Sequence, residues 1–271
     1  MATEEERKAA IRSTFDSVAK GYDNPSFRFF SISAEQMAAC LALKGDEHVL
    51  DVATGTGNVA LQLAPLLPRG RVTAIDFSKE MLGQARMKAT DQVKSNIDFL
   101  QMDMQALELP DGRFDAITCA FGIFFMEDME NQLRHMSDKA KAGGKVILSV
   151  FEHDSFMPTI GLFYDCLMRY GIDRPVPPWE RIGTEDKCVS LLGSVGLTDI
   201  RVIRKEIGYF LRSPDEWWDV LWNGGSRRYL EQLSPRGLAE FRKEHLAEVW
   251  RWATRDGIWL DVRVLYPFGT K

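Results

Sequence analysis

The sequence predicts an α/β protein in which a doubly wound parallel sheet is accompanied by an inserted helical cap. Strand and helix patterns alternate from residue 48 to residue 150, as they do in proteins with parallel sheets. A glycine turn joins the first of these strands to its helix. After residue 150 the composition changes to segments rich in proline and tryptophan, which a sheet does not need for closure.

Two helical patterns precede the first strand. Residues 4–20 read as an amphipathic helix that the Gly-Tyr-Asp-Asn-Pro sequence at 21–25 breaks. A second helix is expected from about residue 33 to residue 43. We therefore divide the chain into residues 1–45, which are N-terminal helices that cover the ligand site, and residues 46–271, which form the main domain.

The first strand and its turn predict a nucleotide-binding crevice. Val49, Leu50 and Val52 are the apolar run of a strand that is buried on both faces. Gly55 and Gly57 allow the backbone to turn sharply and to approach a ligand closely. The helix that begins there offers free N–H groups and the positive end of its dipole to that ligand.

Carboxylates that follow three successive strands indicate which nucleotide binds. Asp51 ends the first strand, where a carboxylate suits a cationic ammonium better than a pyrophosphate. Asp76 ends the strand 71–76, twenty-one residues after Gly55 (76 − 55), a spacing that suits a ribose diol. Asp103 follows a third strand and could accept a bond from an adenine amino group. With no basic residue placed for phosphates, the pattern fits S-adenosylmethionine and not NAD.

An ordered set of motifs adds a family resemblance. The motifs are Leu-Asp-Val-Ala-Thr-Gly-Thr-Gly at 50–57, Ala-Ile-Asp-Phe-Ser-x-x-Met-Leu at 74–82, Asp103, and the segments 114–122 and 142–145. The set resembles class I S-adenosylmethionine-dependent methyltransferases over residues 11 to about 153. The segment 15–23 makes it most similar to the ubiquinone/menaquinone-biosynthesis (UbiE-like) type. One departure is Ala53, a position at which that family more often has glycine. The alanine side chain narrows the turn.

The resemblance implies a Rossmann-like, seven-stranded sheet that is mostly parallel and has an antiparallel last strand. Phe77 and Met81 would form an apolar wall beside the adenine, and Tyr22 would be a lid over the methionine end of the cofactor. Tyr22 could equally anchor the N-terminal helix. The residues expected to bind S-adenosylmethionine, or its product S-adenosylhomocysteine, are Tyr22, Asp51, Ala53, Thr54, Gly55, Gly57, Asp76, Phe77, Met81, Asp103, Met104, Ala120 and Phe121.

Helix and strand signals continue beyond the cofactor motifs. A helix that carries Met129 and Met136 should end at Gly143-Gly144, ahead of a strand at 145–150. A further helix is expected at 184–195 and a strand at 200–211. Ser213-Pro214-Asp215-Glu216 reads as a capping box, and Ser234-Pro235 repeats the N-cap and proline start. Residues 258–266 alternate as one final strand.

Two insertions, at about residues 151–183 and 213–256, are expected to form a substrate cap. Five of the seven tryptophans lie between residues 217 and 252. Aromatic clusters usually belong to a core, but this one lies in an insertion, and we interpret its inner face as an apolar, aromatic substrate chamber.

The predicted reaction is methyl transfer from S-adenosylmethionine to a small apolar or aromatic acceptor by in-line displacement. His153 directly follows the fifth strand and is the candidate general base, with an ordinary loop histidine as the alternative. We assign His153 and Tyr22 as catalytic candidates. The sequence leaves C-, O- and N-methylation open. It also leaves open a non-catalytic S-adenosylmethionine-binding protein and, less favoured, an NAD-dependent oxidoreductase.

Composition narrows the partners. A formal net charge of −5 and a pI near 5.5 argue against a nucleic-acid surface. No apolar run spans a bilayer, and no secretory signal is recognisable, so we expect a cytoplasmic protein without stable membrane insertion. The four cysteines are scattered, which indicates neither disulfides nor a metal site. The expected partner is a small-molecule substrate, and a homodimer is left open.

Overall fold

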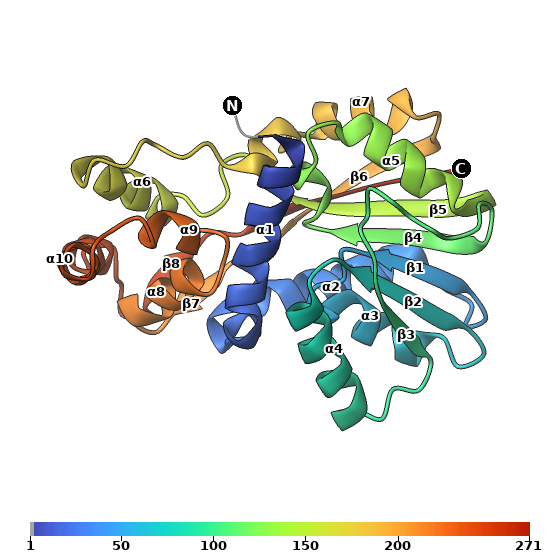
Figure 1. The fold of residues 1–271 in the computed structure, drawn as a ribbon, viewed down its shortest axis with the longest axis horizontal. Helices are drawn as coiled ribbons and strands as arrows, with labels where there is room; N and C mark the ends of the chain where they lie inside the picture. The colour runs from blue at the N-terminus through green and yellow to red at the C-terminus, as the bar shows by residue number, and fades with distance from the viewer. Residues whose placement is uncertain (1–2) are drawn as a thin grey trace. The chain divides into compact units, whose positions relative to one another are not determined.

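A computed structural model describes residues 3–271 (Figure 1), and the chain divides into two compact units. The sheet unit comprises residues 30–153, 178–205 and 264–271. The helical unit comprises the described residues up to 29 together with 154–177 and 206–263. The boundary at residue 45 stays a prediction. Most of both predicted insertions lies in the helical unit, and their role as a substrate cap stays a prediction.

The sheet unit is built on seven strands in the order β3-β2-β1-β4-β5-β9-β6, part of which can be followed in Figure 1. Strands β1 to β5 pair in parallel, whereas β9 runs antiparallel to β5. The prediction of a Rossmann-like sheet with an antiparallel last strand is therefore confirmed. The strands are β1 (His48–Val52), β2 (Arg71–Asp76), β3 (Ile97–Gln101), β4 (Phe114–Ala120), β5 (Ala140–Phe151), β6 (Thr198–Glu206) and β9 (Arg263–Thr270).

The sheet order reverses between β1 and β4, and ligands bind at such a switch point in open α/β sheets. Val49, Leu50 and Val52 of β1 are fully buried, as expected for a strand covered on both faces. The α-helices joined to these strands are α2 (Arg28–Leu41), α3 (Asn58–Leu63), α4 (Lys79–Asp91), α5 (Met129–Asp138) and α7 (Glu185–Ser194).

Two helices of this unit differ from their predicted bounds. Helix α2 begins at Arg28 and not at about residue 33. Helix α5 ends at Asp138 and not at Gly143-Gly144. The helix predicted at 184–195 is α7, and the side chain of its N-cap Thr184 accepts a hydrogen bond from the backbone N–H of Lys187. Strand β5 already begins at Ala140, and its pairing with β4 shifts register between Phe114 and Ala116. The two glycines therefore lie in an irregular start of the strand and not at a helix end.

The helical unit contains α1 (Glu4–Val18), α6 (Thr159–Arg169), α8 (Pro214–Trp222), α9 (Arg227–Leu230), α10 (Pro235–Trp250) and the two-stranded sheet of β7 (Tyr209–Leu211) and β8 (Ile258–Leu260). Ser213 and Ser234 cap α8 and α10, as predicted. The reciprocal half of the predicted capping box is different, because Glu216 accepts its hydrogen bond from the backbone of Arg212 (3.0 Å).

Two predicted strands are each divided. Residues 200–211 form β6 and β7, and residues 258–266 contribute to β8 and β9. The break in the second case follows Leu260, where the carbonyl of Asp261 accepts from Phe156 (2.6 Å) and that of Val262 from Ile207 (2.8 Å). The apolar alternation continues through the break, so it does not reveal that the chain changes sheets.

Among residues 3–271, the structure contains no helix with the length and apolar character required to cross a membrane.

Candidate functional site

Asp51 lies at the carboxyl end of β1 and is almost completely buried. The hydroxyl of Thr54 donates to its Oδ2 (2.5 Å), and the hydroxyl of Thr118 on β4 donates to its Oδ1 (2.6 Å). Burial raises the pKa of Asp51 from 3.8 to about 6, although both hydroxyls oppose the rise. Asp51 is therefore a carboxylate at the switch point that a nearby cation would help to ionise.

Asp76 ties the glycine turn to the end of β2. Its Oδ2 accepts from the backbone N–H of Gly55 and its Oδ1 from that of Ser78, each at 2.8 Å. The hydroxyl of Ser78 in turn accepts from the N–H of Met81 and caps α4. The two loops that follow β1 and β2 are thus held together by one carboxylate, which is 6% exposed.

The turn after β1 has a left-handed backbone at three positions. The φ angles are +55° at Ala53, +56° at Gly55 and +83° at Gly57. A Cβ built on Gly55 would meet nothing within 4 Å, whereas one on Gly57 would lie 3.0 Å from the Cβ of Ala85. Gly57 is therefore required for packing against α4, while the chain leaves space on the Cβ side of Gly55.

Ala53, the departure from the family pattern, has the positive φ that favours glycine. Its neighbour after β4 is Gly122, where an added Cβ would lie 2.9 Å from the Cβ of Ala53 and 2.9 Å from Sγ of Cys119. The alanine is accommodated because the facing residue has no side chain. The narrower turn is thus accompanied by a glycine in the adjacent loop.

One basic residue lies nearer the turn than the sequence suggested. Nζ of Lys88, on α4, donates to Oγ1 of Thr56 and Oδ1 of Asn58, both at 3.3 Å. These oxygens lie at the start of α3, so one ammonium lies near the glycine turn, which the sequence did not indicate. The preference for a sulfonium ligand over a pyrophosphate rests on the strand-end carboxylates Asp51 and Asp76.

Four further predicted cofactor residues follow β2 and β3. Met81 is buried in the first turn of α4, and Phe77 before it is half-buried. After β3, Oδ1 of Asp103 accepts from the N–H of Gln105 (3.0 Å). The carbonyl of Met104 accepts from the side chain of Gln132 (2.6 Å), which fixes this loop to α5. Their contacts with a cofactor stay predictions.

Ala120 and Phe121 leave β4 at the edge where β1 ends. Phe121 has a φ of +53° and stacks on Phe151 of β5, with ring centroids 4.2 Å apart. Phe30 contacts Phe121 edge-on at 5.5 Å, and Trp179 contacts Phe151 edge-on at 5.3 Å. The carboxyl ends of β4 and β5 therefore carry an aromatic group within the sheet unit.

The two catalytic candidates fall in different units. His153 lies two residues after the end of β5 in the sheet unit and is exposed, and its backbone N–H donates to the carbonyl of Gly183 (2.9 Å). Tyr22 belongs to the helical unit and stacks on Phe27 at 5.7 Å, with Phe15 edge-on at 6.2 Å. The catalytic roles of both residues stay predictions.

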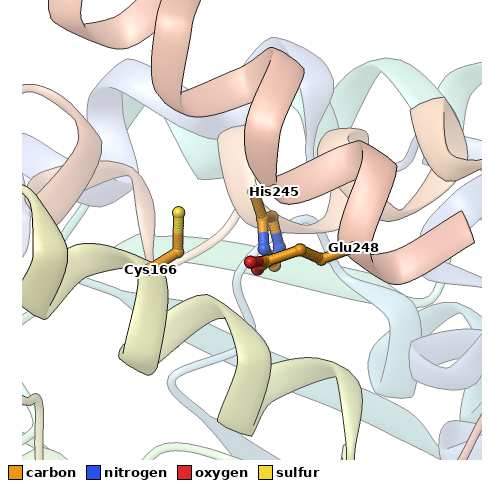
Figure 2. A group of neighbouring side chains, drawn as sticks. All are labelled: Cys166, His245 and Glu248. Carbon is orange, nitrogen blue, oxygen red and sulfur yellow. The ribbon is translucent and has the colours of Figure 1, made fainter. Parts of the chain in front are cut away.

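A polar cluster in the helical unit was not predicted. Ligand atoms of Cys166, His245 and Glu248 all lie within 4.8 Å of one another, from α6 and α10 (Figure 2). Cys166 comes 79 residues before His245 (245 − 166), so only the packing of α6 and α10 brings them together. Such donors are typical of zinc sites, so their fit to a metal needs testing.

The surrounding contacts fit a metal poorly. Nε1 of Trp217 donates to Nε2 of His245 (2.8 Å), so Nε2 is the acceptor and a neutral ring carries its proton on Nδ1. Neither ring nitrogen is then available to bind a metal. Burial lowers the pKa of His245 to about 3, which keeps the ring neutral. Glu248 also accepts from Arg169 (2.7 Å), whose cation would oppose a second cation. The cluster is better explained as polar packing between α6 and α10.

The doubly wound sheet, the glycine turn and the linked strand-end carboxylates define a protein of the class that binds adenosine-containing ligands. The model of the ubiE/COQ5 methyltransferase family matches residues 1–170, which is more than half of the chain. The chain therefore belongs to the ubiE/COQ5 methyltransferase family. S-adenosylmethionine is the cofactor that this membership assigns to the site.

Relatives support the same family over part of their length. The ubiquinone/menaquinone biosynthesis C-methyltransferase UbiE of Serratia proteamaculans is 31% identical over 57% of this chain and 64% of that protein. The corresponding protein of Geobacter sp. is 35% identical over 59% of this chain and 69% of that protein. The demethylmenaquinone methyltransferase of Thermus thermophilus is 37% identical over 51% and 64%. The matches thus span about two thirds of the relatives.

Solved structures support the fold. The YcgJ protein of Bacillus subtilis aligns with a TM-score of 0.61 and 19% identity, over 89% of this chain and 98% of that protein. A phosphoethanolamine N-methyltransferase of Haemonchus contortus, in complex with S-adenosylhomocysteine, aligns with a TM-score of 0.59 and 14% identity, over 100% of this chain and 60% of that one.

The residues at the switch point fit S-adenosylmethionine chemically. Asp51 offers a carboxylate for a cationic ammonium, and Asp76 is a strand-end carboxylate of the kind that binds ribose hydroxyl groups. The space beside Gly55 is where a ligand can approach the backbone.

Proposed function

We propose that this protein transfers a methyl group from S-adenosylmethionine to a small aromatic acceptor by in-line displacement. The observation that carries the proposal is the pairing of loops at the switch point, where Asp76 bridges Gly55 and Ser78 beside the buried Asp51. This arrangement suits the ribose and the ammonium of the cofactor at adjacent strand ends. Family membership supports the same assignment.

The sulfonium methyl is already a strong electrophile when the cofactor is bound, so the protein's contribution is orientation and exclusion of water. Holding the acceptor atom in line with the S–CH₃ bond is worth roughly 7–11 kcal/mol in well-oriented systems. Asp51 and Asp76 would hold the donor. In this proposal a proton released by the acceptor passes to His153, which follows β5 at the same end of the sheet.

An aromatic acceptor is favoured by the ring group at the ends of β4 and β5. Phe121 and Phe151 stack there, and Phe30 and Trp179 contact them edge-on. Planar rings of this kind stabilise a planar acceptor by stacking and edge contacts. Within this class we favour methylation of an activated ring carbon, because the named relatives are C-methyltransferases or act on demethylmenaquinone. The substrate cap, and Tyr22 as a lid over the methionine end of the cofactor, stay part of this proposal.

The test is turnover with a labelled methyl donor against a matched panel of acceptors. The panel contains a hydroquinone with a free ring position, the same ring with that position blocked, a simple phenol and an aromatic amine. Product mass and NMR distinguish a new C–CH₃ bond from O–CH₃ and N–CH₃. We expect labelled product from the hydroquinone with the free ring position and none from the same ring with that position blocked.

Two outcomes would contradict the proposal. Label on oxygen or nitrogen would retain methyl transfer but refute carbon methylation. Calorimetric binding of S-adenosylhomocysteine without label transfer to any acceptor would favour the non-catalytic alternative.

A substitution in the ring group tests the acceptor site itself. Replacing Phe30 with alanine should raise KM for the aromatic acceptor and leave S-adenosylhomocysteine affinity unchanged. The matched control is Phe125→Ala, in the 3₁₀ turn Ile123–Phe125 that follows β4.

A further inference from the structure

The end of the first predicted insertion, residues 178–183, lies in the sheet unit and outside residues 1–170, which match the family model. It contains the 3₁₀ turn η5 (Pro178–Arg181). Trp179 in this turn is half-buried, and its ring meets Phe151 edge-on with centroids 5.3 Å apart. One ring of the group at the ends of β4 and β5 therefore comes from a part of the chain that the family match does not reach.

Arg181 fastens this turn to the loop that follows β4. Its Nη1 donates to the backbone carbonyl of Met126 (2.6 Å) and, at the longer distance of 3.4 Å, to that of Phe124. Its Nη2 donates to the carbonyl of Glu127 (2.5 Å). These carbonyls lie near the end of the 3₁₀ turn Ile123–Phe125, where carbonyl groups need donors from elsewhere. One planar guanidinium with five donors can bind several such carbonyls at once.

Other contacts also anchor this segment. The carbonyl of Gly183 accepts from the backbone N–H of His153, and a Cβ added at Gly183 would lie 2.7 Å from that nitrogen. Nζ of Lys187 donates to the carbonyl of Glu180 (2.7 Å). The segment should therefore stay on the sheet unit when Arg181 is replaced. Arg181 is exposed and its three partners are neutral carbonyls, so its replacement leaves no unpaired charge in the interior.

The rings of the group differ in what holds them. Phe151 ends β5 and Phe121 directly follows β4, so the sheet fixes both. Trp179 belongs to a turn of four residues, and its place depends on how that turn is held. Arg181 joins the turn to the loop that carries Phe124, whose ring meets the Trp179 indole edge-on at 6.3 Å.

We propose that Arg181 is a positioning residue for the methyl acceptor. By holding η5 on the loop after β4, it keeps the indole of Trp179 in place as one wall of the acceptor site. A ring that is already in place binds a planar acceptor without the entropic cost of being ordered on binding. The inference rests on the proposed function, because it assigns the residues that hold the acceptor at that same site.

Acceptor kinetics in the full-length protein test this role, with the hydroquinone that has a free ring position as the acceptor. Trp179→Leu and Arg181→Met should each raise KM for the hydroquinone by about two- to tenfold, the range that corresponds to the contacts of one aromatic ring. The value of kcat and the affinity for S-adenosylhomocysteine should change by less than about twofold. A general loss of structure would instead lower kcat and cofactor affinity as well.

A double-mutant cycle tests whether Arg181 acts through the indole. In the Trp179→Leu background, Arg181→Met should raise KM no further, because residues that act as one unit are not additive. Arg86→Met is the matched control, since Arg86 of α4 also donates to a backbone carbonyl, that of Phe99 (2.9 Å). It should leave KM for the hydroquinone unchanged. Effects of the two substitutions that multiply in the double variant would overturn the proposal.

Fluorine NMR of protein labelled with 5-fluorotryptophan gives a readout that needs no acceptor. The resonance of Trp179 is the one that disappears in Trp179→Leu. Arg181→Met should shift or broaden it, and Arg86→Met should leave it as it is. An unchanged resonance in Arg181→Met would overturn the proposal, as would an unchanged KM in a protein that methylates the hydroquinone. Absence of labelled product from the unmodified protein, with the resonance shifted in Arg181→Met, would refute the proposed function and retain Arg181 as the residue that positions Trp179.

Discussion

Replacing Asp51 with asparagine should make the protein less sensitive to rising pH while weakening cofactor binding. The carboxyl is fully buried, and burial raises its pKa from 3.8 to about 6. The folded state therefore holds the proton more tightly than the unfolded chain does. The stability that this proton contributes is fully present below about pH 3.8 and is lost as the pH rises through about 6.

The magnitude follows from the two pKa values. The difference between 3.8 and about 6, at about 1.36 kcal/mol per pKa unit, corresponds to about 3 kcal/mol in total. Between pH 4 and pH 8, the free energy of unfolding of the unmodified protein should fall by roughly 2 kcal/mol through this group. Asp51→Asn has no carboxyl to titrate and should not show this fall. The asparagine can still be satisfied, because the Thr118 hydroxyl can accept from its amide while donating to the carbonyl of Leu50, 3.4 Å away.

Urea unfolding of both proteins at a series of pH values measures the effect. The difference in free energy of unfolding, variant minus unmodified, should grow by roughly 2 kcal/mol from pH 4 to pH 8. Asp91→Asn, at the exposed end of α4, is the control and should show little change. A difference that stays flat over this range would mean that burial does not penalise ionised Asp51, and the reasoning would be refuted.

The same carboxyl predicts a pH dependence of ligand binding. A bound ammonium favours ionised Asp51, so binding must release the proton that is present below about pH 6. Affinity for S-adenosylhomocysteine should therefore fall about tenfold between pH 6.5 and pH 5 in the unmodified protein. Asp51→Asn should bind more weakly throughout and lose this dependence. Calorimetry at matched ionic strength tests both statements, and an equal slope in the two proteins would assign the titration elsewhere.

Three further predictions concern the loops around the switch point. Asp76→Ala should weaken S-adenosylhomocysteine binding by roughly 1–3 kcal/mol, the sum of two lost hydrogen bonds, as measured by calorimetry. His153→Ala should lower turnover by about 10²–10⁴-fold and leave cofactor affinity unchanged if this residue is the base. Gly122→Ala should lower the free energy of unfolding by about 1–3 kcal/mol, because the added Cβ would lie 2.9 Å from both the Cβ of Ala53 and Sγ of Cys119. Adding Ala53→Gly should recover part of this loss, as measured by urea unfolding.

Each of these predictions has an outcome that would contradict it, and Asp76→Ala also has a control variant. Asp98→Ala removes a strand carboxylate that pairs with Arg71, away from the switch point, and should leave affinity unchanged. Unchanged affinity in Asp76→Ala, with an intact circular dichroism spectrum, would remove Asp76 from the cofactor site. Full turnover in His153→Ala would mean that the acceptor needs no protein base. Strict additivity of Gly122→Ala and Ala53→Gly would show that the two loops do not contact as described.

Short-range signals located the glycine turn after β1 and the carboxylate at the end of β2 correctly. The hydrogen bond of 2.8 Å that joins Gly55 to Asp76 was not predicted, because the spacing was interpreted only as suiting a ribose. Thr118 was missed because its partner Asp51 is 67 residues away and their pairing depends on strand register, which periodicity does not specify. Lys88 was missed for a related reason, since only helix packing brings its ammonium to the start of α3.

The later part of the chain was predicted less completely. N-cap signals at Ser213 and Ser234 are local and were correct. The division of 258–266 was not visible, because Ile258 and Leu260 continue the same alternation that Val264 and Tyr266 follow in another sheet. A repeat of two specifies which residues share a face and not which neighbour the strand pairs with.

The family match covers the predicted cofactor site but not the whole chain. The match ends at residue 170, one residue after α6, whereas strands β6 and β9 of the sheet are formed by later residues. Every predicted cofactor residue lies before residue 122 and hence inside the match. Most of the predicted cap lies outside it. Similarity to the quinone-pathway relatives therefore bears on the cofactor site and on three of the four rings proposed to receive the acceptor, Phe30, Phe121 and Phe151. The part of the proposal that the family match does not support is the cap, because most of its residues come after residue 170.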